Sequence, residues 1–229
     1  MLASGMSAAL LCVASTNTFA SDAEFGVWAI ASATDVLPGS EERGPWRYSL
    51  DAQYRFIDDN RDFRQYLIRP AIGYTLSNGV QVWLGYARLK TARNNSRSAY
   101  ENRFWQQVNW RVGELLGGTL SARVRLEQRS ASTGDDIGQV ARVMLKFVRP
   151  FSGASGSYWI ASLEPFVSLS DTDWGLEKGL GQNRFAVGIG RPVGEHLVIE
   201  AGYMNQYIFR DTVEDLSNHL AVIHFKMNF

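Results

Sequence analysis

The sequence predicts an all-β fold, a closed antiparallel transmembrane up-and-down β-barrel of 10–12 strands. Three observations predict it: polar and apolar residues alternate along most of the chain, the alternating segments are long, and short turns alternate with longer polar loops. Successive side chains of a strand leave opposite faces, so a period of two indicates strands. Strands of soluble proteins usually run about five or six residues, whereas a tilted strand needs roughly 9–11 to cross a bilayer.

The alternation is clearest in three segments. From Trp46 to Phe56 every even-numbered residue is apolar and every odd-numbered one is polar, and residues 120–127 follow the same rule. The last segment places Ala221 and Ile223 on one face and Val222 and His224 on the other. The strands expected in chain order are 24–33, 45–57, 63–76, 79–90, 99–113, 118–130, 138–149, 157–170, 182–192, 195–210 and 217–229.

The connections between these strands are of two kinds. Residues 77–79, 113–118 and 192–195 are short and rich in turn residues, whereas 91–98, 130–138 and 171–181 are longer and polar. This asymmetry is typical of outer-membrane barrels. The odd strand count conflicts with the even number expected there. Either segment 24–33 pairs incompletely, or it lies in the lumen, or two strands have been merged.

Residues 1–20 differ from the rest of the chain. They carry no charge, contain the apolar run 8–14 and end in Thr18-Phe19-Ala20, with small residues where a signal peptidase cleaves. We therefore expect a signal peptide at 1–20 and a barrel domain at 21–229, although the usual basic start is missing. The alternative, a first core helix, has no amphipathic stripe or cap in its favour.

Composition excludes several classes of protein. Lys and Arg number 23 and Asp and Glu number 23, so net charge does not favour nucleic-acid binding. No segment after residue 20 approaches about 18 consecutive apolar residues, which excludes a helical membrane protein. The single cysteine, Cys12, excludes a disulfide framework and a cysteine metal cluster.

Aromatic residues are expected at both edges of the apolar faces, as in interfacial girdles. They are Trp46, Tyr48, Tyr54, Phe56, Trp110, Tyr203, Tyr207 and Phe209. The alternative is a soluble eight-stranded barrel such as a lipocalin, with its polar face outside. The number and length of the expected strands and the N-terminal leader favour the membrane barrel.

If the apolar residues face lipid, the charged residues between them face the lumen. The expected charge ladder comprises Arg47, Asp51, Arg55, Arg69, Glu101, Arg103, Arg111, Arg123, Arg125, Glu127, Arg129, Arg142, Lys146, Glu164, Arg184 and Glu200. One hypothesis is structural, because such pairs cross-link strands and fill a narrow barrel. The other is functional, because the excess of arginines would attract anions.

An enzyme would need a nucleophile or carboxylate with a histidine base within reach. Ser217 and His219 share a strand face and form the best pair for a lipid-modifying hydrolase. His196 lies at an expected turn and His224 is expected to point into the lumen. Asp135, Asp136, Asp171 and Asp173 could bind cations, but acidic loop residues are usually only solvated. No nucleotide or histidine metal motif is present, so we expect no cofactor and no metal.

The last strand, with Phe225, Met227 and the terminal Phe229, resembles the assembly signal of bacterial outer-membrane barrels. Residues 101–107, Glu-Asn-Arg-Phe-Trp-Gln-Gln, and 123–129, Arg-Val-Arg-Leu-Glu-Gln-Arg, resemble an uncharacterised family of short Gram-negative outer-membrane barrels, a domain of unknown function. The likeness extends from about residue 24 to the C-terminus.

The resemblance implies an outer-membrane location, the barrel-assembly machinery as a partner during biogenesis, and membrane lipid and lipopolysaccharide around the folded protein. It implies no nucleic-acid partner and supplies no catalytic residues. We expect a non-enzymatic barrel with a narrow or plugged lumen, acting as a minor anion-leaning channel or an envelope scaffold. The alternative is the hydrolase at the outer end of the last strand.

Overall fold

The computed structural model describes residues 22–37, 44–58, 63–92, 97–153, 156–211 and 213–229. The expected signal peptide at 1–20 lies outside these residues. Within them no helix is long and apolar enough to span a membrane, and no group of three or more His, Cys, Asp or Glu side chains could hold a metal ion.

Eleven strands make up the secondary structure of the described residues, and each corresponds to a strand expected from the alternation. The longest, β5, has 17 residues, and the shortest, β8, has 11. Their bounds are β1 Asp22–Val36, β2 Trp46–Asp58, β3 Phe63–Thr75, β4 Gln81–Ala92, β5 Ala99–Leu115, β6 Gly118–Ala131, β7 Ile137–Pro150, β8 Tyr158–Ser168, β9 Gly179–Val193, β10 Leu197–Ile208 and β11 Leu216–Met227.

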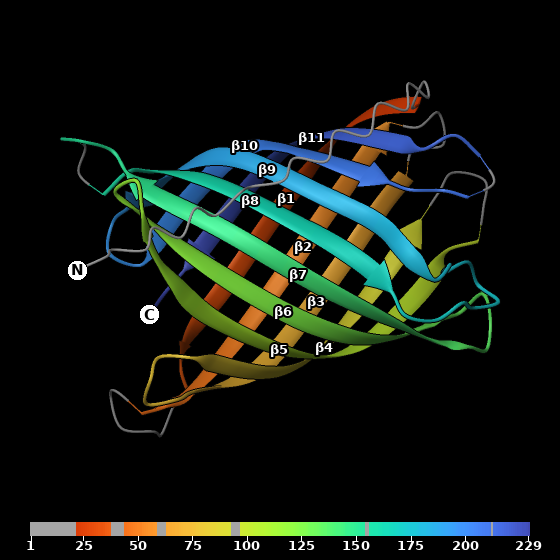
Figure 1. Cartoon of the computed structure of the whole chain (residues 1–229), viewed down its shortest axis with the longest axis horizontal. Helices are drawn as coiled ribbons and strands as arrows, with labels where there is room; N and C mark the ends of the chain where they lie inside the picture. The colour runs from red at the N-terminus through yellow and green to blue at the C-terminus, as the bar shows by residue number, and fades with distance from the viewer. Residues whose placement is uncertain (1–21, 38–43, 59–62, 93–96, 154–155, 212) are drawn as a thin grey trace, which may run out of the picture.

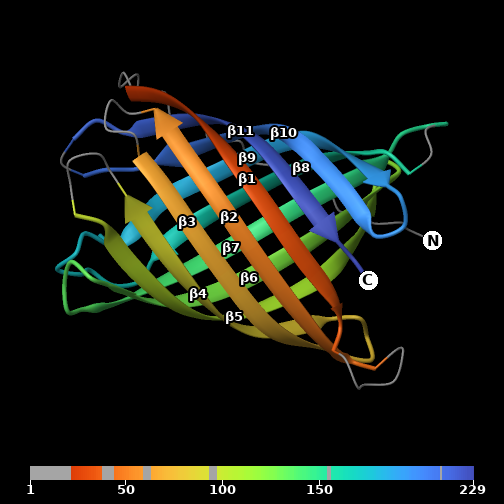
Figure 2. The ribbon, with the colours of Figure 1, turned by 180° about the vertical axis from the view of Figure 1, so that it is seen from behind.

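The strands form one closed barrel in which each pairs with its neighbours in sequence and β11 returns to β1 (Figures 1 and 2). The expected closed, all-β architecture is therefore confirmed. The closing pair, from Asp22 opposite Leu216 to Ala33 opposite Met227, is parallel, so the expectation of antiparallel pairing throughout is corrected there. None of the three explanations for the odd strand count holds, since β1 is a full wall strand that also pairs with β2.

The two ends of the barrel differ in their connections. At one end β5 turns into β6 through Leu116 and Gly117, both with positive φ, and β9 turns into β10 at Gly194. We call this the short-turn end; β11 and the described chain finish there. The opposite, long-loop end carries residues 132–136, 169–178 and 209–215, and the short-turn end also has two longer connections, residues 37–45 and 151–157. Because β1 runs parallel to β11, β1 begins at the long-loop end.

The side chains on the two faces of the wall have opposite character. Outward positions hold apolar residues that are about half exposed, among them Ile68, Leu84, Phe104 and Trp159. Inward positions hold the buried charged residues together with an apolar cluster of Trp28, Ile57 and Leu220. The barrel therefore has its polar side within and its apolar side outside.

Inward glycines determine where the inward aromatic rings lie. A Cβ on Gly85 would stand 2.1 Å from the Trp105 ring, and one on Gly73 would stand 2.5 Å from the Trp83 ring. Each glycine is paired directly with the tryptophan on the next strand. The rings therefore lie flat against the wall and leave the middle of the lumen to longer side chains.

Candidate functional site

The structure places the residues expected in the charge ladder at inward-facing positions, on eight of the described strands. Arg111 differs from the other residues of the ladder because its side chain is exposed, near the short-turn end, where it pairs with Glu114. Arg47 lies near the same end, half-buried, and its Nε has no hydrogen-bond partner among the described residues. The remaining charges gather into two clusters, one layer and a separate ion pair of Arg69 with Asp51, at 3.0 Å.

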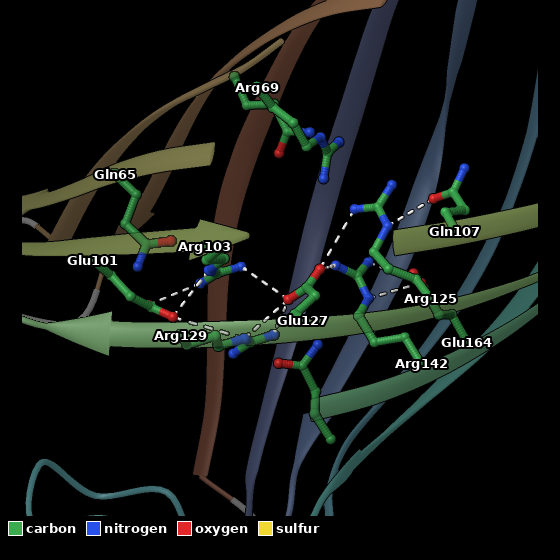
Figure 3. A network of polar contacts seen from close by, with 12 residues as sticks. Gln65, Arg69, Glu101, Arg103, Gln107, Arg125, Glu127, Arg129, Arg142 and Glu164 are labelled. Carbon is green, nitrogen blue, oxygen red and sulfur yellow. Dashed lines mark hydrogen bonds and ion pairs between the residues drawn. The ribbon is translucent and has the colours of Figure 1, made fainter. Parts of the chain in front are cut away.

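Glu127 on β6 is the centre of the first cluster, which we call the Glu127 cluster. Its carboxylate is almost fully buried and forms ion pairs with four arginines at N–O distances of 2.6–3.8 Å: Arg129, Arg142, Arg125 and Arg103. Figure 3 shows Glu127 between Arg103 and Arg129 on one side and Arg125 and Arg142 on the other. A buried carboxylate is tolerable in this setting because its oxygens accept several charge-assisted hydrogen bonds.

Further carboxylates extend this cluster across the wall. Glu101 accepts two hydrogen bonds from Arg103, both of 2.9 Å. Glu164 pairs with Arg123 and, at 2.8 Å, with Arg142. Arg142 therefore bridges Glu127 on β6 and Glu164 on β8, which links three adjacent strands through side chains.

Arginines stacked on aromatic rings form a layer next to this cluster. We define the arginine–aromatic layer as Trp28, Arg55, Arg142, Phe166 and Arg184. Arg55 lies 4.2 Å above Trp28, Arg142 lies 4.1 Å above Phe166, and Arg184 contacts both rings at 4.8 and 4.5 Å. Neither Arg55 nor Arg184 forms an ion pair with a carboxylate of the described residues. Arg55 instead donates hydrogen bonds to the side-chain oxygens of Gln53 and Gln65, which are neutral, so the stacked guanidinium keeps its full positive charge in the lumen.

The layer separates two cavities in the lumen. The cavity toward the short-turn end has a volume of about 280 Å³, and the cavity toward the long-loop end about 300 Å³. Trp28, Arg55 and Arg184 line both. Six cationic side chains and three carboxylates line the short-turn cavity: Arg55, Arg69, Arg123, Arg142, Lys146 and Arg184 against Asp51, Glu164 and Glu200.

Glu200 on β10 is the centre of the second cluster, the Glu200 cluster. Its carboxylate lies 2.9 Å from Lys226 Nζ, 3.8 Å from Lys146 Nζ and 3.6 Å from His224 Nδ1, and accepts a hydrogen bond of 2.9 Å from Tyr158. The two lysines are 26% and 31% exposed, so water reaches this cluster. His224 points into the lumen and also contacts the Ser32 hydroxyl.

Ser217 and His219, the residues of the hydrolase hypothesis, lie at outward positions of β11 and have other partners. The Ser217 hydroxyl accepts a hydrogen bond from Asn205, and the His219 ring lies 2.7 Å from the Tyr203 hydroxyl. His219 also stacks on Phe25 of β1. The hydrolase role remains a prediction; Ser217→Ala and His219→Ala test it, since each should abolish turnover of lipid substrates.

The residues of the expected assembly signal lie on the outer side of β11. Phe225 is exposed, and Met227 is the last residue of the strand. Phe229 follows it and lies against the ring of His196, whose Nδ1 is 2.9 Å from the Asn228 carbonyl. His196 lies in the turn at 194–196, as expected, and holds the end of the chain there.

The acidic loop residues hold two long loops together. Backbone N–H groups of Asp135 and Asp136 donate to the Asp173 carboxylate at 2.8 and 3.2 Å. These two hydrogen bonds lower the pKa of Asp173 below its ordinary value. Asp136 in turn accepts a hydrogen bond from the Asp173 backbone.

Sequence reasoning missed the aromatic part of the lumen. Trp105 shares its parity with Glu101 and Arg103, so the alternation contained a signal that it points inward. Trp28 lies in a segment of continuous small and apolar residues, where alternation could not assign a face. The aromatic residues expected in girdles, such as Trp46, Tyr54 and Tyr203, do lie exposed on the outer face.

Comparison with known proteins agrees with the resemblance of the sequence motifs to a domain of unknown function. An uncharacterised protein of Methylorubrum extorquens is 34% identical over 167 residues, which cover 71% of this chain and 72% of that protein. A family described as "Protein of unknown function (DUF2490)" matches residues 25–217, which run from within β1 to the start of β11. The chain belongs to this DUF2490 family.

Proposed function

We propose that this chain is an integral outer-membrane β-barrel whose narrow lumen passes small anions at a low rate. The observation that carries the membrane location is the polarity of the wall, which exposes large apolar side chains on its outer face and buries charges within. A soluble monomer rarely exposes contiguous apolar patches beyond a few hundred Å². Strands of 11–17 residues are also long enough to cross a bilayer.

Aromatic contacts at the two rims support the same location. Trp46 packs on Tyr74 and Phe151 packs on Trp159 near the short-turn end, whereas Tyr207 packs on Phe209 near the long-loop end. Outer-membrane barrels have short turns in the periplasm and long loops outside. In this orientation β11, with Phe225, Met227 and Phe229, ends in the periplasm, where the barrel-assembly machinery would recognise it.

The preference for anions rests on the chemistry of the lumen. Cations outnumber carboxylates around the short-turn cavity, and Arg55 and Arg184, which form no ion pair with a described carboxylate, line both cavities. The buried Trp28 Nε1 and Arg123 Nε also lack acceptors among the described residues. Guanidinium and indole N–H groups only donate hydrogen bonds, so such a lumen favours species that accept them.

Fractionation of cells that express the chain tests the location. We expect the protein in the outer-membrane fraction, resistant to carbonate extraction, and migrating faster on a gel when unboiled than when boiled. Recovery in the soluble fraction, or identical migration of boiled and unboiled samples, would count against a membrane barrel.

Planar-bilayer recording of the purified protein tests conduction. Small discrete steps with a reversal potential that indicates anion preference would support the proposal. Silence from a barrel that is demonstrably folded would mean that the arginine–aromatic layer closes the lumen, and the role would then be that of an envelope scaffold. Cation preference would contradict the part assigned to the arginines.

A further inference from the structure

The outer wall has a hollow over β1, β2 and β3, which we call the outer groove. It has a volume of about 600 Å³ and lies where small outward side chains, Ala29, Ala31 and Ala52, follow one another on adjacent strands. Tyr54, Tyr66 and Phe225 are among its remaining lining residues. Figure 2 shows these strands side by side, with β11 next to β1. The lining of the groove is mostly apolar, and the hollow exists because alanines occupy positions that larger side chains would fill.

Two cations line the same groove on β4. Arg88 and Lys90 occupy outward positions and are exposed, and Lys90 stands two residues before β4 ends at the long-loop end. The Arg88 guanidinium carbon lies 5.1 Å and Lys90 Nζ 5.9 Å from the centre of the Tyr100 ring. Neither cation forms an ion pair with any described carboxylate.

Neighbouring outward polar groups of β4, β5 and β6, unlike these two cations, form side-chain hydrogen bonds with one another. Gln106 and Gln128 donate to each other at 3.1 and 3.2 Å, and the Tyr86 hydroxyl donates to Asn102 at 2.6 Å. Arginine or lysine on a lipid-facing surface is costly toward the bilayer midplane and tolerated near the interface. The position of Lys90 and Tyr100 near strand ends therefore fits the level of lipid headgroups.

We infer that the outer groove with Arg88 and Lys90 is a binding site for a phosphorylated lipid of the outer leaflet. The cations bind the phosphate groups, and an acyl chain lies over the three alanines between Tyr54 and Phe225. The occupant is a lipid because the apolar groove is continuous with its cationic end. Such a surface suits an amphiphile with an anionic headgroup. This inference rests on the proposed outer-membrane location and adds a specific partner to it.

The test measures binding of lipid A, a bisphosphorylated lipid of that leaflet, to the full-length protein in mild detergent by native mass spectrometry. We expect the double variant Arg88→Gln/Lys90→Gln to bind it roughly 30-fold more weakly, at about a factor of five for each cation near a charged surface. The matched control is Arg149→Gln/Arg191→Gln, which removes two exposed cations at the short-turn end. It should bind lipid A like the wild type.

Three further measurements separate the contributions of the phosphate groups and the acyl chains to the affinity. Dephosphorylated lipid A should bind as weakly to the wild type as lipid A binds to the double variant. Millimolar inorganic phosphate should not displace lipid A, because it lacks acyl chains. Ala52→Phe, which fills the groove and leaves the cations, should also weaken binding.

The outcomes against the inference are distinct from failure of the proposed location. A folded, membrane-extracted barrel that binds lipid A equally in wild type and double variant would overturn the lipid site alone. A wild-type species of twice the mass without lipid, abolished by Ala52→Phe, would assign the groove to a second copy and also overturn it. A chain recovered without membranes would overturn both proposals.

Discussion

The two charge clusters of the lumen stabilise their central carboxylates in different ways. Glu127 is surrounded by arginines whose rigid guanidinium groups reach it from strands β5, β6 and β7, and it is almost fully buried. Glu200 is surrounded by flexible lysines, a tyrosine and a histidine, and its cluster is partly open to water. The Glu127 cluster therefore cross-links neighbouring strands. The lysines of the Glu200 cluster can exchange their carboxylate partner for water, and this cluster lines the open part of the lumen.

The largest effect is expected from Glu127→Gln. Four arginines would lose the carboxylate they share, and breaking a buried ion pair costs about 3–5 kcal/mol because the remaining charge stays unpaired. The free energy of unfolding should fall by that amount in urea titrations followed by tryptophan fluorescence. Glu114→Gln, which removes the exposed partner of Arg111, serves as control and should cost less than about 1 kcal/mol. Equal losses would mean that the Glu127 cluster has no special role.

The double variant Arg55→Ala/Arg184→Ala should have the next largest effect. Each arginine stacks on Trp28, and a cation–π contact of this kind contributes about 0.5–2 kcal/mol. Removing both should join the two cavities, raise single-channel conductance and reduce anion preference. Arg149→Ala/Arg191→Ala, which removes two exposed cations that line neither cavity, is the control. A variant with unchanged conductance would show that the constriction lies elsewhere.

Glu200→Gln should have a smaller effect on stability. An amide can still accept the hydrogen bond from Tyr158, and water can solvate the two lysines once their partner is neutral. We expect a loss of about 1 kcal/mol, as for an ion pair that is open to solvent. The same urea titration measures it. A loss as large as that of Glu127→Gln would remove the distinction between the clusters.

The smallest effect concerns the contact between the two long loops. The pKa of Asp173 is lowered in the folded protein, so its stabilising contribution is complete above the ordinary aspartate pKa and is lost as the pH falls through the lowered value. The protection of the Asp135 and Asp136 amides from hydrogen exchange, which is the intrinsic rate divided by the observed rate, should therefore fall in acid. In Asp173→Asn this pH dependence should disappear. Persistence of the effect in that variant would assign it to another group.

The strands could be predicted because alternation is local. The segment 99–113, for example, became β5 with two residues added at its end. Which charges meet could not be predicted, because Arg142 and Glu164 come together only through the register of β7 and β8. The parallel closure follows from the odd strand count, because the first and last strands of an up-and-down barrel with eleven strands run in the same direction. The inward face of Trp28 could not be predicted, because its segment does not alternate and only the register of β1 and β2 pairs it with Arg55.

The parallel pair β1–β11 also has a consequence for the time course of folding. The other ten described pairings join strands adjacent in sequence, so each closes a short loop. The last joins the two ends of the sheet, and closing so long a loop costs about 2–3 kcal/mol more in chain entropy than a hairpin does. Parallel pairs are also slightly less stable per residue. We therefore expect this closure to be the slow step, during which β1 and β11 are free edges that can pair with another chain.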